Sequence, residues 1–565
     1  MEDLERSISE SFAINHKYFA QTTLLVNEAK DYKRVEEMLQ EFLSLHISKT
    51  GNQVIGGHCL EYILKYSKML EKYLEDPKKL HKKSKREKVT INLTKLHMLV
   101  SHIKYCFILD KEDFDSLPED HERKQAIRAV TTTIDFDDKK ELQRQLEKFF
   151  KTYNLMKAVM SRTSEYKPSI WRNLLSGWLT IYYSVINKKK GRREAKLFDS
   201  DGNIEGMKLL WELTESKLLV KLLPIAFVSI NFNQMIYIPR LSPNILEDYH
   251  KPSDNEVAVH YTELIAQEPI LAGAKYTLSP DPGHVRVPIR IISPIPLHKI
   301  QHELLKESSC TCCSSVSHEG KKFERLIIHF HGGGYLSQTS FSHQSYSRIW
   351  ANKIGEPIFS IDYRLAPENP FPDGIDDAWQ AYTWLVKYSH KFLGVVPHKI
   401  IVVGDSAGGN FVTSLTLKCI QSGFRPPDAV FMIYPALSMA IEHISKGALS
   451  SLEDQLLSHG IFYVLREAYL KGKYPANNVY VSPVHCDGAL LDKFPKTEMI
   501  VTLNDPLSGD ALRFADRLIR HGRQIHITEY PDGIHGVMSL GNRNGVPMYA
   551  RAINDAVKIL KELIE

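Results

Sequence analysis

Cysteine is scarce in this chain of 565 residues, which contains only seven, an odd number. So few thiols exclude a disulfide-stapled secreted scaffold and favour a reducing compartment. Long apolar runs are also missing, since the most apolar long stretch, 218–230, is interrupted by Lys221 and Pro224 and is too short to span a bilayer. The sequence begins with an acidic segment rather than an apolar one, so we expect no signal peptide and a cytoplasmic protein without a transmembrane segment.

The chain also lacks a strong overall charge. Its net charge is +5, from 72 Lys and Arg against 67 Asp and Glu, which argues against a nucleic-acid partner. Two local basic runs stand out, and each suits either an anionic surface such as phospholipid headgroups or, more simply, a solvated loop or helix end. The first comprises Lys78, Lys79, Lys82, Lys83, Lys85, Arg86 and Lys88, and the second Lys188, Lys189, Lys190, Arg192 and Arg193.

Complete signatures for metals and nucleotides are absent. The segment Cys310–Cys313, with His318 nearby, has no second cysteine pair to complete a zinc site, so we interpret it as a reduced surface loop. The glycine run at 332–334 fits neither of the two common phosphate-binding patterns. We therefore expect neither a metal nor an organic cofactor.

The residue pattern divides the chain into two regions. Residues 1–254 show helix-like apolar spacing, whereas strands and helices alternate in the second region, 255–565, most clearly from Phe323 onward. Repeated strand–helix units predict a mostly parallel sheet covered by helices on both faces, an α/β fold preceded by a large helical domain. Helices are predicted at 58–73, 94–109, 139–160, 169–186, 206–223, 374–388, 510–521 and 548–564. Strands are predicted at 257–265, 285–292, 325–330, 358–361, 400–403, 429–434, 499–503 and 525–529.

The strongest motif follows the apolar strand predicted at 400–403. Gly404, Asp405, Ser406, Ala407 and Gly408 fit G-x-S-x-G, and a helix-like run comes next. Strand, tight turn and helix are the context of a nucleophile elbow, in which small flanking residues let strand and helix approach closely. The motif predicts an exposed serine hydroxyl at the top of a sheet. A glycine-rich turn that happens to hold a serine is the alternative.

A glycine loop follows the strand that ends at Phe330. His331 precedes Gly332, Gly333 and Gly334, the H-G-G-G arrangement found in esterases, whose bare amides can approach a substrate carbonyl. We predict that the N–H groups of Gly332 and Gly333 stabilise an oxyanion, completed by that of Ala407. The imidazole of His331, like that of His329, is expected to pack and to fix the shape of the loop.

A nucleophilic serine needs a base, and the base needs an orienting acid. His535 follows the strand predicted at 525–529, and Asp505 follows the strand predicted at 499–503. The chain order Ser406, Asp505, His535 is that expected of an α/β-hydrolase triad, although Asp510 is a rival for the acid.

Together these motifs resemble the hormone-sensitive lipase family of serine hydrolases. The resemblance is carried by the segments 329–335, 362–368, 404–410, 505–507 and 535–536, and further by 210–215 and 480–486; it is most specific in 325–410 and loosest before residue 200. It implies an intracellular neutral lipase and esterase acting on acylglycerols and on cholesteryl or retinyl esters. It further implies recruitment to lipid droplets, contact with droplet-coat or lipid-binding proteins through the helical domain, and a homodimer as a further expectation.

The chain departs from this family in several places. Val537 stands where an aromatic residue usually follows His-Gly, and Ser508-Gly509-Asp510 replaces the usual acidic pair. Only the segment 438–480 occupies the place of the long serine-rich insertion of the vertebrate family members, and no Arg-Arg-x-Ser pattern occurs. Control by a cyclic-nucleotide-dependent kinase through that insertion is therefore not expected.

The segment 438–480 is rich in leucine and aromatic residues and is predicted to be a cap or lid, although a helix pair packed on the core fits the pattern equally well. Two other functions stay open. A short-chain carboxylesterase or deacetylase would share every catalytic residue, and a non-catalytic binding module would be expected to have lost a member of the triad.

Overall fold

The computed structural model describes residues 2–20, 26–46, 53–76, short stretches within 80–100, 117–201 except 137, 165 and 168, 204–212, 228–238, 286–297, 322–440, 451, 454–538 and 547–565. Contacts divide the chain into two units. The helical unit comprises Met1–Ala126, Tyr153–Gly206 and Ala440–Tyr463, and the sheet unit comprises Ile127–Thr152, Met207–Met439 and Val464–Glu565.

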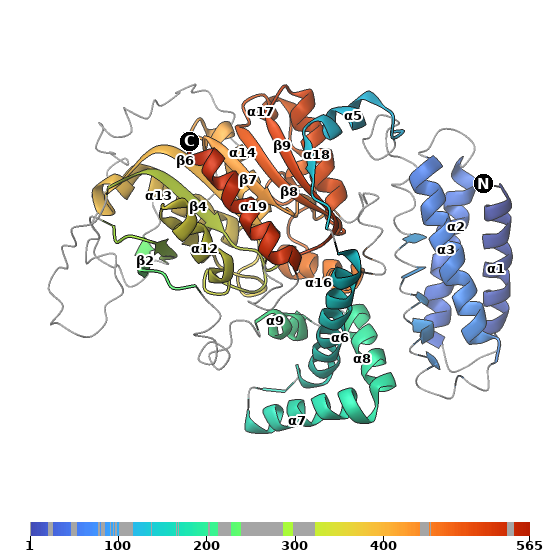
Figure 1. Ribbon diagram of the computed structural model, residues 1–565. Coiled ribbons are helices and arrows are strands. Elements are labelled where there is room, and N and C mark those ends of the chain that lie inside the picture. Colours follow the sequence, from blue (N-terminus) through green and yellow to red (C-terminus); the bar gives the residue numbers. More distant parts are fainter. Residues whose placement is uncertain are drawn as a thin grey trace. The chain divides into compact units, whose positions relative to one another are not determined.

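A nine-stranded sheet forms the centre of the sheet unit (Figure 1). Its strands are β1 (Thr131–Thr133), β2 (Phe232–Ile238), β3 (Val287–Ser293), β4 (Phe323–Phe330), β5 (Ile358–Ile361), β6 (Val395–Asp405), β7 (Ala429–Ile433), β8 (Lys496–Asn504) and β9 (Ile525–Ile534). The order is β1-β9-β8-β7-β6-β4-β5-β3-β2. All neighbours pair in parallel except β3, which is antiparallel to both β2 and β5.

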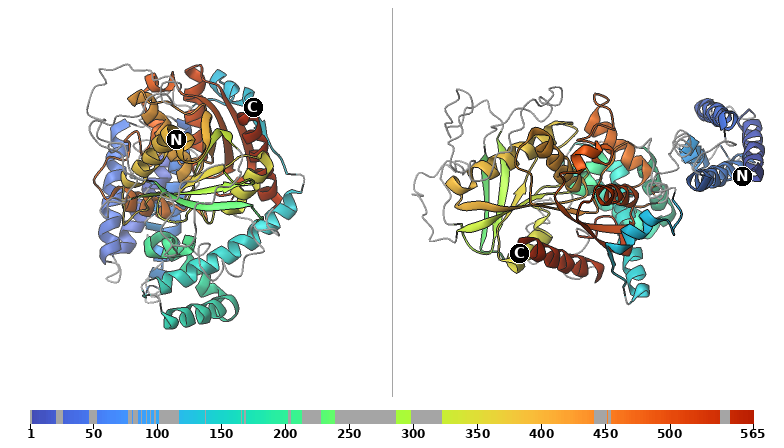
Figure 2. Two further views of the ribbon diagram at one scale, coloured as in Figure 1. Left: turned by 90° about the vertical axis from the view of Figure 1, so that its left-hand side faces the viewer. Right: turned by 90° about the horizontal axis from the view of Figure 1, so that it is seen from above.

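Helices cover both faces of this sheet, which explains why its central strands are continuous apolar runs. On one face lie α12 (Gln344–Ile354) and α19 (Pro547–Ile564), where Trp350 and Leu560 join a core with Ile401 and Phe431. On the other face lie α13 (Asp373–Phe392), α14 (Ala407–Ser422) and α18 (Ser508–Arg520). The right-hand view of Figure 2 shows α19 on one side of the strands and these helices on the other.

Two separate apolar clusters organise the helical unit. In the first, α1 (Glu2–Ala20), α2 (Val26–His46) and α3 (Gln53–Leu74) pack around residues such as Phe12, Tyr32 and Leu70. In the second, α6 (Lys139–Thr163), α7 (Ile170–Ile181), the π-helical turn η3 (Tyr182–Ile186) and α8 (Lys188–Asp201) pack around a smaller core. No helix in the described residues has the length and apolar character needed to cross a membrane.

A buried lysine ties the second cluster together. The side chain of Lys157 on α6 is fully buried, and its Nζ lies 2.9 Å from both carboxylate oxygens of Asp199 on α8 and 3.0 Å from the carbonyl oxygen of Gln455. Because an unpaired buried charge is costly, these three acceptor oxygens, from two residues, hold the ammonium group in place. Part of the predicted cap segment is therefore anchored to the helical unit.

The predicted boundary at residue 254 does not coincide with the division into units. Strands β1 and β2 both precede it, yet β1 pairs with β9 and β2 pairs with β3. A three-residue strand such as β1 leaves no periodicity in the sequence, and only its pairing with β9 makes it a strand. The strand predicted at 257–265, the cysteine segment at 310–313, the first lysines of the run at 78–88 and most of the helix predicted at 94–109 lie outside the described residues.

Helices predicted from apolar spacing agree closely with the observed ones. The runs at 139–160 and 169–186 correspond to α6 and to α7 with η3, and the run at 548–564 corresponds to α19. Strands predicted at 325–330, 358–361, 429–434 and 499–503 correspond to β4, β5, β7 and β8, and the strand at 525–529 extends as β9 to Ile534. The helix α12 was not predicted, although Tyr346, Ile349, Trp350 and Ile354 recur at the spacing of one helical face.

The close packing of the turn between β6 and α14 predicts that a side chain at Gly408 destabilises the protein. A Cβ at Gly408 would lie 1.9 Å from the carbonyl oxygen of Phe330, whereas a Cβ at Gly177 in α7 would meet no atom within 4 Å. Gly408→Ala should therefore lower the free energy of unfolding of the sheet unit by about 1–3 kcal/mol. Gly177→Ala should raise the stability of α7 by about 0.5–1 kcal/mol. Scanning calorimetry of the two variants measures both changes, and equal melting temperatures would contradict the prediction.

Candidate active site

Ser406 lies on the turn between β6 and α14, in the strained geometry that the G-x-S-x-G pattern predicts. Its φ of 54° and ψ of −116° fall where a residue with a side chain is unfavourable. Two backbone hydrogen bonds hold the turn: the Ser406 N–H donates to Ile433, and the Ser406 carbonyl accepts from Ala436. A Cβ at Gly404 would lie 2.3 Å from the carbonyl oxygen of Gly408, so this position has no room for a side chain.

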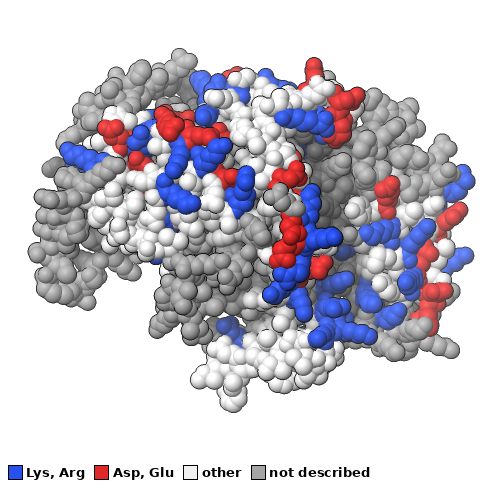
Figure 3. Space-filling view, viewed as in Figure 1, with Lys and Arg blue, Asp and Glu red and all other residues white. Residues whose placement is uncertain are grey.

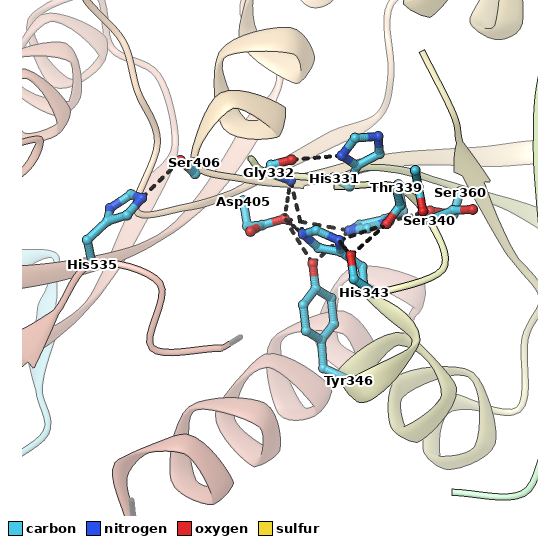
Figure 4. A network of polar contacts seen from close by, with 12 residues as sticks. His331, Gly332, Thr339, Ser340, His343, Tyr346, Ser360, Asp405, Ser406 and His535 are labelled. Atoms are coloured by element: carbon cyan, nitrogen blue, oxygen red, sulfur yellow. Dashed lines mark hydrogen bonds and ion pairs between the residues drawn. The ribbon is translucent and has the colours of Figure 1, made fainter. Parts of the chain in front are cut away.

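The imidazole of His535 connects Ser406 to Asp505. The Nε2 atom of His535 lies 2.9 Å from Ser406 Oγ, and its Nδ1 atom lies 2.8 Å from Asp505 Oδ2. Figure 4 shows the imidazole directed at the hydroxyl of Ser406. The ring of Tyr434 packs edge-on against the imidazole, with 5.0 Å between the centroids. The structure therefore brings together the three residues predicted as a triad, in the geometry that proton transfer from Ser406 requires.

Asp505 occupies the acid position rather than its rival Asp510. The Asp505 carboxylate is buried and accepts hydrogen bonds from the hydroxyl of Thr502, at 3.0 Å, and from the backbone N–H of Leu507, at 2.9 Å. Asp510 lies in the first turn of α18, where its carboxylate pairs with Arg513. The two donors fix the Asp505 carboxylate, which in turn orients His535.

The glycine loop lies directly against the serine turn, but one of its predicted donors is already engaged. The Gly332 N–H lies 2.9 Å from Asp405 Oδ1 and 3.2 Å from His343 Nε2, so this amide faces into the protein (Figure 4). The prediction that Gly332 is an oxyanion donor is therefore wrong, because a buried carboxylate accepts its hydrogen. The N–H groups of Gly333, Gly334 and Ala407 make no hydrogen bond to another described residue.

Asp405 is the centre of a buried polar network beneath the loop. Besides the Gly332 N–H, its carboxylate accepts a hydrogen bond from the hydroxyl of Tyr346, at 2.9 Å, and pairs with His343, at 3.5 Å. Burial opposes the charged form of this carboxyl, but His343 and the hydrogen bonds outweigh it and lower the pKa of Asp405 below its ordinary value. Asp405 therefore remains ionised and holds the loop in position. Neither His343 nor Tyr346 was identified from the sequence, because no motif contains them.

The two histidines near the loop have packing roles, as expected. His329 is fully buried, with Nδ1 lying 2.7 Å from the hydroxyl of Ser360, and burial together with the nearby His343 lowers its pKa to about 3. The ring of His331 stacks on Tyr363 with 4.1 Å between centroids, and burial lowers its pKa well below the usual range. Both side chains are therefore neutral at physiological pH and shape the loop rather than transfer protons.

Bulky side chains crowd the outer side of the glycine loop. A Cβ at Gly334 would lie 2.7 Å from Leu465 on α16 (His459–Leu470) and 2.7 Å from Trp211 on α9 (Ile204–Glu212). Tyr469, also on α16, stacks on Tyr335 with 4.1 Å between the ring centroids. The predicted cap segment, 438–480, therefore contributes side chains that pack directly on the loop. Trp211 was not assigned to the site from the sequence, since only the fold brings α9 to it.

Comparison with known proteins agrees with the fold of the sheet unit. Residues 327–539 match the family model of the α/β-hydrolase fold. The chain is 30% identical to the hormone-sensitive lipase of Mus musculus over 275 residues, and 32% identical to that of Bos taurus over 266 residues. These alignments cover 46% and 44% of this chain but only 32% and 31% of those lipases. A carboxylesterase of Mycobacterium tuberculosis is 27% identical over 42% of this chain and 74% of its own length.

The fold and the strained serine turn therefore define the sheet unit as an α/β-hydrolase. Within that class, the matched region is similar to the hormone-sensitive lipases. The matched region spans about a third of the length of the curated lipases.

Replacing the buried acid beneath the loop tests its role. Asp405→Asn should remove the charge that holds the Gly332 amide, and a misplaced loop should lower kcat by about 10²-fold. Because the pKa of Asp405 is lower in the folded state than its ordinary value of 3.8, the stability it contributes is present above that pH and is lost as the pH falls further. The unfolding free energy of Asp405→Asn should therefore depend less on pH below about 4 than that of the wild type.

Asp516→Asn is the matched control, because Asp516 is equally buried but pairs with Arg520 on α18. Ester turnover and acid-titrated denaturant unfolding would be measured for both variants. A wild-type kcat for Asp405→Asn, or the same loss in both variants, would show that the carboxylate does not position the loop.

Proposed function

We propose that the protein is a serine carboxylic-ester hydrolase that acts on neutral lipid esters. The observation that carries this proposal is the unbroken contact from Asp505 through His535 to Ser406, at 2.8 and 2.9 Å, beside backbone amides that have no hydrogen-bond partner among the described residues. A buried acid, an oriented imidazole and a strained serine form the arrangement that activates a hydroxyl for attack on a carbonyl.

The reaction proceeds by acyl transfer in two steps. His535 takes the proton of Ser406 as Oγ attacks the ester carbonyl, and Asp505 stabilises the imidazolium that results. The negative charge on the carbonyl oxygen is met by the N–H groups of Gly333, Gly334 and Ala407, and one such donor contributes about 2.7–4 kcal/mol. His535 then protonates the leaving alcohol, and a water molecule, activated in the same way, releases the carboxylic acid and restores Ser406.

The substrates proposed are diacylglycerols and triacylglycerols, with cholesteryl and retinyl esters as further candidates. Likeness to the hormone-sensitive lipases supports this class. The apolar residues that pack beside the glycine loop, Trp211 and Leu465, are also suited to an acyl chain rather than a polar substrate. The setting proposed is the mobilisation of lipid stores in the cytoplasm, at lipid droplets and with droplet-coat or lipid-binding proteins as partners.

A short-chain carboxylesterase is the second candidate. It is supported by the likeness to the mycobacterial carboxylesterase, which this chain matches over 74% of that enzyme's length. Both functions use the same catalytic groups, so they differ only in the length of acyl chain that the site accepts. The apolar side chains over the glycine loop favour the lipase.

Hydrolysis of an acyl-chain series by the purified protein tests the proposal. We expect turnover of emulsified acylglycerols with long as well as short chains. Ser406→Ala should abolish turnover, and Asp505→Asn should lower kcat by about 10⁴-fold, since the imidazole loses its orientation. Ser422→Ala, at the last residue of the same helix α14, is the control and should leave the rate unchanged.

Two outcomes would change the assignment. A rate that collapses beyond short acyl chains would favour the carboxylesterase and remove the lipase. Equal rates for the wild type and Ser406→Ala would contradict ester hydrolysis at this site and leave a binding module as the remaining function.

A further inference from the structure

The helix α7 and the turn η3 expose an unusual row of large apolar side chains. The exposed fraction is 79% for Trp171, 77% for Ile170 and 71% for Val185. Leu174, Trp178, Ile181 and Ile186 are also more than half exposed. We call these seven residues the outer face of α7–η3. Single exposed apolar residues are ordinary on a protein surface, but a contiguous row that includes two tryptophans marks an interaction surface.

The fold does not use this outer face for its own packing. Leu179 and Tyr183, on the opposite side, join Ala158 and Val159 of α6 in the small core of the helical unit. Residues 171, 174, 178, 181 and 185 recur at the three- and four-residue spacing of one helical stripe. The segment is therefore apolar on two sides. Only the side that carries Leu179 and Tyr183 packs on the core, so packing does not explain the apolar residues of the outer face.

Positive charge surrounds this stripe. Residues 166–193 contain seven Lys and Arg residues and no Asp or Glu. Lys188, Lys189 and Arg192, which follow directly on α8, are exposed. In Figure 3, drawn from the same side as Figure 1, the lobe that holds α7 at the foot of the view is white and is bordered by blue. The basic run singled out in the sequence thus lies at the end of an exposed apolar row.

The combination of exposed apolar and basic side chains indicates what binds the outer face of α7–η3. Tryptophan, isoleucine and leucine favour the boundary between headgroups and acyl chains, and lysine and arginine favour anionic headgroups at the same depth. A second copy of the chain would bring an equally basic segment against the first, with no acidic residue within 166–193 to balance it. A phospholipid surface satisfies the apolar and the basic residues together.

We propose that the outer face of α7–η3, with Lys188, Lys189 and Arg192, docks the protein on an anionic phospholipid surface that covers neutral lipid. The helix lies in the plane of that surface, with the tryptophans among the acyl chains and the basic residues at the headgroups. This inference deepens the proposed function, since it names the surface by which a lipase would reach its substrate. Docking itself does not require Ser406.

Flotation with emulsion droplets tests the proposal. The droplets are triolein covered by phosphatidylcholine, with or without phosphatidylserine, and the protein carries Ser406→Ala so that it cannot consume them. We expect it to float with the droplets, more strongly when phosphatidylserine is present. Adding Ile170→Ser and Ile181→Ser should lower the bound fraction at least tenfold on both kinds of droplet. Adding Lys188→Glu and Lys189→Glu instead should lower it mainly on the anionic droplets.

Matched controls separate docking from folding. Ile14→Ser with Ile295→Ser removes two isoleucines that are each 41% exposed, and Lys558→Glu with Lys561→Glu makes the same charge change on α19. Both controls should float like the parent protein. In chains that retain Ser406, the α7 variants should hydrolyse a soluble short-chain ester at the wild-type rate, so failed docking and failed catalysis are distinguished.

Three results would overturn the proposal. The first is a parent protein that stays in solution with both kinds of droplet. The second is an equal loss of flotation in the α7 variants and their controls. The third is self-association, measured by sedimentation, that the α7 variants abolish while flotation persists.

Discussion

The structure of the site depends on one close approach between two backbone segments. The turn that carries Ser406 presses against the end of β4, so that the Cα of Gly408 faces the carbonyl oxygen of Phe330 with no room for a methyl group. This contact brings the serine and the glycine loop within reach of one bound carbonyl group. It also explains why glycine stands two residues before and two residues after the serine, since a side chain at either position would push the sheet and the helix apart.

The same approach creates the need for Asp405. Once the loop is packed against the turn, the Gly332 amide is directed into the interior, where an unpaired donor would be costly. The carboxylate of Asp405, the residue before Ser406, accepts the hydrogen of this amide. His343 and Tyr346 in turn stabilise the carboxylate. One residue of the serine motif therefore supports the loop, while the next residue presents the hydroxyl. The amides of the loop are divided in a similar way, since that of Gly332 is anchored and those of Gly333 and Gly334 make no hydrogen bond to another described residue.

Much of this architecture was predictable because it depends on local patterns. The apolar run at 400–403, the flanking glycines and the chain order of Ser406, Asp505 and His535 indicate a parallel sheet with its functional groups at the strand ends. The parts that were missed depend on the fold. The direction of the Gly332 amide is set by Asp405, 73 residues away, and Trp211 reaches the loop only because α9 packs beside it.

The helical unit shows more clearly that features which depend on the fold cannot be predicted from local sequence patterns. Apolar spacing predicted the helix at 169–186, but a helix with apolar residues on two sides gives no indication of which side faces the core. Only the packing of Leu179 and Tyr183 identifies the outer face of α7–η3 as the exposed one. Likewise β1 is defined by its partner β9, because three threonines, although β-branched, are too short a run to predict a strand at the sheet edge.

The central claim is that His535 and Asp505 make Ser406 a nucleophile. Peptide mass spectrometry after reaction with an organophosphonate ester, which phosphonylates activated serines with loss of its leaving group, tests it most directly. We predict one adduct per chain, on Ser406, and a large drop in the rate of modification in His535→Ala. Modification of another serine, or an unchanged rate at Ser406 without the imidazole, would contradict it.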